Sequence, residues 1–194
     1  MVLDPGAVGF VFGAPPQDPA TFIPPLFTLT SHVDDLYASI FATTAVYTQS
    51  GESFATPPAM NGFGKKGRRM VLYHGVSDPI FSPEDTIRWF EGLDRSSGAQ
   101  NVARLFLVPG MGHCSGGPAT DQFDLLTPLM RWVEQGEPPR SVTASARGPS
   151  NPGGANPDLP AGWSADRTRP LCPFPKVAIY DGGDVERASS FDCR

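Results

Sequence analysis

Long hydrophobic runs are missing from this sequence, and so is any concentration of positive charge. No apolar run approaches the ~18–20 residues that a membrane-spanning helix needs. The first ten residues, MVLDPGAVGF, show no basic segment followed by a long apolar stretch, so we expect no signal peptide in this sequence. The net charge is −5, and Lys and Arg form no stripe. We therefore expect neither a membrane nor a nucleic acid among the partners.

Cysteine is scarce, and its count is odd. Cys114 lies in a Gly-rich loop, whereas Cys172 and Cys193 lie near the C-terminus. The sequence has no C-x-x-C motif and its three His are scattered, so we predict no bound metal. Three cysteines fit either one disulfide and one unpaired cysteine in an exported protein, or three free thiols in a cytosolic one.

Turn-forming residues are abundant. The 194 residues include 21 Gly and 22 Pro, more than a fifth of the chain. This proportion stays below the ~25–30% that is typical of disordered low-complexity chains. Hydrophobic residues make up 40% and include 13 Phe, which is enough to build a core. The composition predicts a folded, loop-rich chain of the size of one domain.

The first 67 residues form the least regular part of the sequence. Six prolines precede residue 30, which predicts an extended segment there, without a helix or a central strand. A helix is expected next, capped by Ser31 and carrying two Asp in its first turn. Its apolar residues recur every three to four positions from Val33 to Phe41. Residues 48–67 are again rich in Gly and Pro and predict a loop.

Residues 68–146 are the most regular. Apolar runs at residues 69–74 and 101–108 predict two strands that are covered on both faces. Ser82-Pro83, followed by two acidic residues, predicts the start of a helix between them. A second helix is expected after the later strand, with apolar residues from Phe123 to Val133; Pro128 should delay or kink it, and Gly136 should end it. The order strand, helix, strand, helix predicts parallel strands with a right-handed crossover.

The last part of the sequence, residues 147–194, predicts little regular structure. Residues 147–170 are rich in Pro, Gly and Asn and predict a long loop, followed by a short tail that carries two cysteines. The run Asp181-Gly-Gly-Asp184 is similar to a calcium loop but lacks further ligands at alternate positions. We instead expect a turn in which Asp184 caps a short final helix.

Two polar residues follow the two predicted strands. Asp78 comes after the first strand and His113 after the second, and in open α/β sheets chemistry takes place beyond the carboxyl ends of the strands. A His oriented by an Asp serves as general base for a nucleophile. The alternative is a turn Asp and a surface His. No G-x-S-x-G motif occurs, and no Ser before Asp78 follows an apolar strand and opens a helix. We expect Ser115 to be a loop hydroxyl and His74, at the end of its strand, to be packed and hydrogen-bonded.

Three motifs resemble the tannase and feruloyl esterase family, an α/β-hydrolase family. They are VLYHGVSDP at residues 71–79, VPGMGHC at 108–114 and RTRPLCP at 167–173, in the family's order and with fitting spacing. The segments at 41–47 and 56–58 are also similar to that family. The resemblance covers nearly the whole chain but corresponds only to the C-terminal third of a family member.

The resemblance implies a fold and a role for each matched residue. The fold is α/β, the C-terminal portion of an α/β-hydrolase sheet with two parallel strands and flanking helices. Residues 1–67 would be the end of a lid and its return to the core, 68–146 the core with the acid and base loops, and 147–194 the loop and tail. Asp78 matches the acid and His113 the base.

The resemblance also assigns the cysteines. Cys114 matches a cysteine that bridges, in the family, to one just before the nucleophilic Ser, and so it is an orphan here. Cys172 and Cys193 match a terminal disulfide. Apart from the resemblance, Phe81 lies three residues after Asp78 and is a candidate to stack on an aromatic acyl group. The alternative for Phe81 is a loop aromatic that covers the core.

The function implied is a carboxylic-ester hydrolase acting on esters of aromatic, phenolic acids through Ser, Asp and His. The nucleophilic Ser has no counterpart in this sequence, so we expect a truncated chain that is inactive alone. The calcium ligands that the family's lid often carries also have no counterpart, so we expect no cofactor. The missing N-terminal portion is then a candidate partner. The alternatives are a non-catalytic binding module and one half of a split esterase. Family members are secreted or periplasmic.

Overall fold

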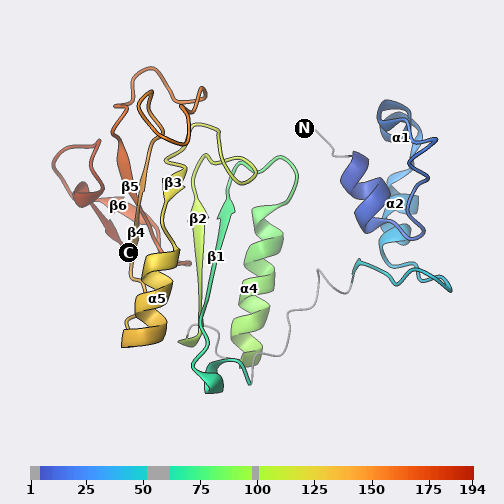
Figure 1. The fold of residues 1–194 in the computed structure, drawn as a ribbon, viewed down its shortest axis with the longest axis horizontal. Helices are drawn as coiled ribbons and strands as arrows, with labels where there is room; N and C mark the ends of the chain where they lie inside the picture. The colour runs from blue at the N-terminus through green and yellow to red at the C-terminus, as the bar shows by residue number, and fades with distance from the viewer. Residues whose placement is uncertain (1–4, 52–61, 98–100) are drawn as a thin grey trace. The chain divides into compact units, whose positions relative to one another are not determined.

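The structure is a computed structural model that describes residues 5–51, 62–97 and 101–194. The chain divides into two compact units, Met1–Pro58 and Ala59–Arg194, which we call unit 1 and unit 2 (Figure 1). The segment at 56–58 that contributes to the family resemblance lies outside the described residues. That residues 1–67 represent the end of a lid stays a prediction.

The described part of unit 1 contains three short helical segments: η1 (Ala7–Phe12), α1 (Pro24–Thr30) and α2 (Val33–Ile40). The prediction that the first 30 residues form no helix is wrong. Pro24 and Pro25 occupy the first two positions of α1, where the missing N–H costs nothing and the fixed φ suits a helix.

The start of α2 differs from the prediction by one residue. His32, not Ser31, precedes the helix, and no side chain caps it. The His32 carbonyl accepts the N–H of Leu36 and begins the helical ladder. Asp34 and Asp35 lie in the first turn as predicted. Val33 is largely exposed, so the apolar spacing of this helix does not correspond to a buried face.

A parallel two-stranded sheet organises unit 2. Strand β1 (Met70–Gly75) pairs in register with β2 (Ala103–Val108), and α4 (Pro83–Ser97) connects them. These elements confirm the predicted strand, helix, strand order. Pro83 is the first residue of α4, with Glu84 and Asp85 in its first turn, where acidic groups interact favourably with the helix dipole.

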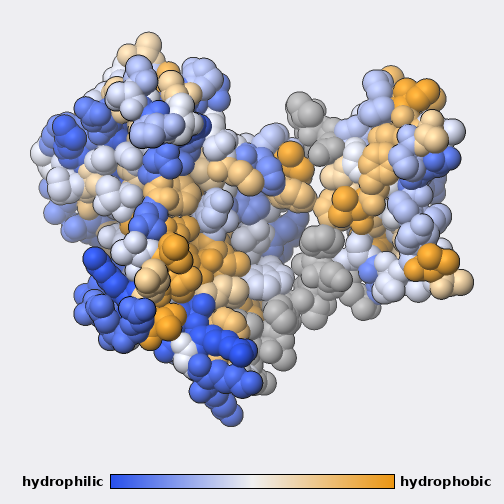
Figure 2. Space-filling model, viewed as in Figure 1, coloured by the Kyte–Doolittle hydropathy of each residue, from blue (hydrophilic) through white to orange (hydrophobic). Residues whose placement is uncertain are grey.

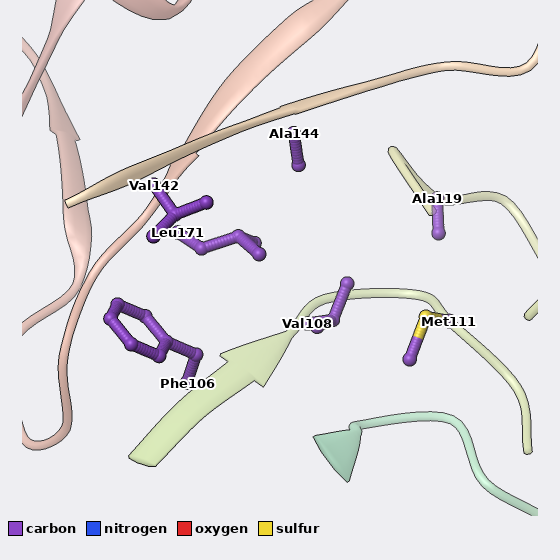
Figure 3. Close-up of a cluster of buried hydrophobic side chains, with 7 residues drawn as sticks. All are labelled: Phe106, Val108, Met111, Ala119, Val142, Ala144 and Leu171. Carbon is purple, nitrogen blue, oxygen red and sulfur yellow. The ribbon is translucent and has the colours of Figure 1, made fainter. Parts of the chain in front are cut away.

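Strand β2 is buried on both faces because its side chains alternate between two clusters. Phe106 and Val108 face a cluster that also contains Met111, Ala119, Val142, Ala144 and Leu171 (Figure 3). Ala103 and Leu105 face the other way and pack with Phe90 and Leu93 of α4. A run of apolar residues without polar alternation is what such a doubly covered strand requires.

Helix α5 (Leu126–Gln135) begins late, as predicted from Pro128, and ends at Gly136, whose φ is 74°. Its first N–H groups, those of Leu126 and Thr127, donate to the Asp124 carboxylate. Phe123 was predicted to lie on this helix but belongs to a strand, because the turn at Asp124 separates the two.

Five further strands were not predicted. The first sheet they form has the order β3 (Gln122–Phe123), β4 (Val142–Ser145), β5 (Thr168–Leu171), all antiparallel. The second is the antiparallel pair of β6 (Ala178–Tyr180) and β7 (Phe191–Cys193). Short 3₁₀ turns, η2 (Gly64–Lys66) and η4 (Ala188–Ser190), complete the described part of the unit. The predicted loop at 147–170 therefore ends in a strand.

The final turn also differs from expectation. Asp184 accepts the N–H of Glu186 through its carboxylate, so it caps a turn. The 3₁₀ turn η4 begins later, and its first N–H, that of Ala188, donates to the hydroxyl of Thr168 and not to Asp184.

The outer edge of β2 is covered by the segment that follows β5. Phe106 forms an antiparallel bridge with Pro173, and the N–H of Phe174 donates to the Leu105 carbonyl at 2.8 Å. A disulfide joins Cys172, beside β5, to Cys193, the last residue of β7, which confirms the pairing implied by the resemblance.

Hydrophobic side chains gather in an exposed band where α5 and the β1–β2 sheet lie (Figures 1 and 2). The exposed members on these elements include Tyr73 of β1 and Leu126, Met130 and Val133 of α5. Contiguous apolar surface of this kind is a common mark of an interaction face.

Candidate active site

The two polar residues predicted to meet at the carboxyl ends of β1 and β2 do meet. Asp78 lies on the turn after β1, and His113 lies on the Gly-rich loop after β2. Nδ1 of His113 is 2.8 Å from Oδ2 of Asp78, a hydrogen-bond distance. Because parallel strands place their carboxyl ends at one edge, two loops 35 residues apart converge on one point.

The Asp78 carboxylate is held from both sides. Its side chain is 5% exposed. Oδ1 accepts the N–H groups of Ile80 at 2.8 Å and Phe81 at 3.1 Å, while Oδ2 accepts from His113. Burial by itself raises the pKa of Asp78, but the hydrogen bonds from His113, Ile80 and Phe81 outweigh it and lower the pKa below its ordinary value. Asp78 is therefore an oriented anion.

The His113 imidazole faces outward. Its side chain is 42% exposed, and no hydrogen bond from a described residue reaches Nε2. The Phe81 ring lies against it, with ring centroids 5.3 Å apart. An imidazole that donates Nδ1–H to a carboxylate and presents Nε2 to solvent can accept a proton from a hydroxyl group that approaches Nε2. Phe81 itself is 38% exposed.

Close backbone packing fixes the loop that carries His113. Ser77 donates its N–H to the Met111 carbonyl at 2.9 Å, which joins the acid loop to the base loop. Gly75, the last residue of β1, lies directly under this loop, and a Cβ there would collide with the backbone of Met111 and Gly112. The sequence therefore uses glycine where the two loops touch.

A buried ion pair supports the same loop and was missed in the sequence. The Asp121 side chain is fully buried and accepts the N–H of Gly116 at 2.7 Å. Arg147 donates to it through Nε at 3.0 Å and Nη2 at 2.8 Å. Burial raises the pKa of Asp121, but the hydrogen bonds from Arg147 and Gly116 and the Arg147 charge lower it overall.

The long loop after β4 completes this support. The Asn156 side chain donates to the Gly117 carbonyl at 2.9 Å, and the Asp158 carboxylate accepts the Gly117 N–H at 3.0 Å. Arg147 also donates to the carbonyls of Gly153 and Gly154. The loop at 147–158 thus clamps the loop at 110–121, and no local sequence pattern signalled it.

The remaining candidate residues take the following places. His74 is hydrogen-bonded, as predicted, and its ring lies beside Asp78. Cys114 is exposed and free, with a φ of 64°, next to the base. Ser115 donates its backbone N–H to the His113 carbonyl, a contact that does not involve its hydroxyl or the imidazole nitrogens. Nothing in the described residues identifies a nucleophile.

The described residues contain no group of three or more His, Cys, Asp or Glu that could hold a metal ion. Asp181 and Asp184, at the ends of the DGGD run, have protein partners: Asp181 pairs with Arg194 at 2.6 Å and Asp184 accepts the Glu186 N–H. No helix among residues 5–51, 62–97 and 101–194 is both long and apolar enough to cross a bilayer.

Comparison with known sequences identifies relatives that are ester hydrolases by name. The chain is 46% identical over 158 residues to the mono(2-hydroxyethyl) terephthalate hydrolase of Piscinibacter sakaiensis. This match covers 79% of this chain and 24% of that protein. It is 33% identical over 142 residues to a probable feruloyl esterase of Arthroderma benhamiae, with 70% and 24% covered. The chain thus spans about a quarter of the length of these relatives.

Comparison with solved structures shows a shared fold. A crystal structure of an esterase from Aspergillus oryzae matches 90% of this chain and 35% of its own, with a TM-score of 0.65 at 19% identity. Feruloyl esterase B from Aspergillus oryzae matches with a TM-score of 0.54 at 21% identity, over 92% of this chain and 34% of its own. The family model described as tannase and feruloyl esterase matches residues 24–194. This chain belongs to the tannase and feruloyl esterase family.

Proposed function

We propose that this chain carries the acid and the base of a serine carboxylic-ester hydrolase acting on esters of aromatic, phenolic acids. The observation that supports it best is the 2.8 Å hydrogen bond from Nδ1 of His113 to Oδ2 of Asp78, with Nε2 facing outward. Membership in a family whose named relatives hydrolyse esters supports the reaction class.

In the proposed mechanism His113 takes the proton of a serine hydroxyl through Nε2 as that oxygen attacks the ester carbonyl. Asp78 stabilises the imidazolium that forms and keeps the ring in the tautomer with hydrogen on Nδ1. The imidazolium then protonates the leaving alcohol. Water, activated by the same imidazole, finally releases the acid from the acyl-serine.

Phe81 is the proposed contact for the aromatic acyl group. Its ring is partly exposed and lies 5.3 Å from the His113 ring, so a phenolic ring stacked on it would bring its ester group close to Nε2. Phe81 also packs in the turn that holds Asp78, so its position is tied to that of the acid.

We further propose that the serine is supplied from outside these 194 residues. The sequence has no nucleophile motif, and the chain spans about a quarter of its relatives. It would then form the C-terminal portion of an α/β-hydrolase sheet, with the exposed hydrophobic band on β1 and α5 meeting the remainder. We propose no cofactor for this chain. The Cys172–Cys193 disulfide favours an oxidising compartment, and so export.

The test is complementation. The chain is co-expressed with the part of the Piscinibacter sakaiensis hydrolase that it does not cover, and hydrolysis of methyl ferulate, methyl gallate and mono(2-hydroxyethyl) terephthalate is measured. We expect activity only with both pieces. His113→Ala should abolish it, Asp78→Asn should lower kcat about 10⁴-fold, and Ser115→Ala should leave it unchanged.

The alternative functions give different results. Hydrolysis by the chain alone that depends on Ser115 would show that the nucleophile is misplaced here. No hydrolysis in any combination, together with saturable binding of free ferulate or gallate by the chain alone, would favour a non-catalytic binding module. Activity that needs a separately translated second chain in the native organism would identify one half of a split esterase.

A further inference from the structure

We propose that His74 is a positioning residue, held between Thr86 and the Phe81 carbonyl as the tautomer with hydrogen on Nε2, that holds the turn carrying Asp78 and Phe81. The inference deepens the proposed function and rests on it for the roles of Asp78 and Phe81. It concerns a different histidine and a different pair of nitrogen atoms from the proposed acid and base.

The His74 side chain lies between β1 and the first turns of α4, only 12% exposed. Nδ1 is 2.7 Å from Oγ1 of Thr86 on α4. Nε2 is 3.2 Å from the Phe81 carbonyl oxygen and 3.6 Å from Oδ2 of Asp78. Both ring nitrogens therefore have polar partners, and one nitrogen faces the turn of the proposed acid.

The chemistry of these partners fixes the tautomer. A carbonyl oxygen and a carboxylate only accept hydrogen bonds, so Nε2 must carry the hydrogen that points toward them. Thr86 has a hydroxyl that can donate, and it satisfies Nδ1 as an acceptor. The neutral Nε2–H ring is thus satisfied on both sides, whereas the other neutral tautomer would set the Nε2 lone pair against two acceptors.

This arrangement holds one residue of the acid turn at both ends. The Phe81 N–H donates to Oδ1 of Asp78, and the Phe81 carbonyl accepts from His74. The Phe81 backbone is therefore tied both to Asp78 and to β1, through His74. Since Nε2 is 3.6 Å from Oδ2 of Asp78, beyond hydrogen-bond length, that oxygen stays available to His113.

Nuclear magnetic resonance on the full chain tests this directly, because the sequence has only three His. With ¹⁵N-labelled histidine, long-range correlations from the carbon-bound ring protons show which ring nitrogen carries hydrogen. A His32→Gln variant removes the signals of the one histidine that belongs to neither proposal. At neutral pH we expect the Nε2–H pattern for His74 and the opposite Nδ1–H pattern for His113. A cationic or Nδ1–H His74 would overturn the proposal.

Matched variants test the positioning role. Thr86→Val should keep the Nε2–H pattern, because the Phe81 carbonyl still accepts from Nε2, but it should shift the His74 Nδ1 resonance, which loses its hydrogen bond; Thr86→Ser should leave that resonance in place. His74→Leu should convert His113 from the Nδ1–H pattern toward the Nε2–H form that free histidine favours, and His74→Gln, which keeps a donor near the Phe81 carbonyl, should restore it. A purely structural role would lower the melting temperature without changing the His113 tautomer.

The outcomes separate the two proposals. Unchanged His113 signals in His74→Leu would overturn the role of His74; if that variant does not fold, unchanged His74 signals in Thr86→Val would do so. An Nε2–H pattern at His113 in the unsubstituted chain would instead count against the proposed acid–base pair. A negative esterase assay would count against the proposed function, but it would not change the tautomer measured for His74.

Discussion

Replacing Asp121 by Asn should destabilise unit 2 strongly, although the two side chains have nearly the same shape. The carboxylate is fully buried and accepts from Gly116 and from two nitrogens of Arg147. In either orientation of the Asn side chain, its NH₂ group would face at least one of these N–H donors and could not accept from it. Arg147, with a side chain only 17% exposed, would lose its counter-charge.

The magnitude follows from the burial of the pair. Removing one partner of a buried ion pair costs about 3–5 kcal/mol, because it leaves an uncompensated charge away from water. Since a domain of this size has a free energy of unfolding of ~5–15 kcal/mol, a large part of the stability would be lost. The melting temperature should fall by roughly 6–20 °C.

Thermal unfolding followed by circular dichroism measures this effect, with two further variants as references. Asp85→Asn removes a carboxylate from an exposed pair with Arg88 at 3.4 Å and should cost less than about 1 kcal/mol. The double variant Asp121→Asn with Arg147→Met removes both charges and should recover about 1–3 kcal/mol of the loss. A single Asp121→Asn variant that unfolds like Asp85→Asn would refute the reasoning, since the pair would then be no better than a surface contact.

Three more perturbations have defined outcomes. Cys172→Ser removes the disulfide between Cys172 and Cys193, which are 21 residues apart in the sequence. Chemical denaturation should show that the free energy of unfolding falls by about 3 kcal/mol. The pKa values of Asp78 and Asp121 are lowered from 3.8, so the two carboxylates stabilise the fold above that pH, and this stabilisation should disappear as the pH falls through their folded pKa values. Urea titrations at a series of pH values across the acid range measure the effect. An equal free energy of unfolding at the highest and the lowest pH would contradict it. Gly75→Ala should cost about 1–3 kcal/mol in a melting experiment, because the loop bearing the base passes directly over this glycine; an unchanged melting temperature would mean that the loop gives way freely.

The parts of the fold that could be predicted have strong local signals. The strands at β1 and β2 are unbroken apolar runs, and α4 starts with Pro83 and two acidic residues. The strands β4 to β7 are three or four residues long, and β5 contains Pro170, so neither length nor alternation marks them. The pairing of β4 with β5 is decided by tertiary contact with the Phe106 cluster.

The candidate site divides in the same way. Asp78 and His113 could be predicted to meet because each follows a strand of one parallel sheet. Asp121 and Arg147 could not, since they lie 26 residues apart in irregular segments, and their pairing depends on how two loops fold over one another. The same holds for Thr86, whose hydroxyl is one of many on helix surfaces until the packing of α4 brings it to His74.

The Cys172–Cys193 disulfide closes the last part of the chain into a covalent ring that contains both β6 and β7. A protease that cuts inside this ring, for example at the exposed Gly182-Gly183 turn, breaks the backbone but releases no peptide. Such a nicked molecule runs as one band on a gel without reductant, and it separates into two pieces only after reduction. Because the severed ends stay tethered, the hairpin strands remain at high local concentration and can pair again.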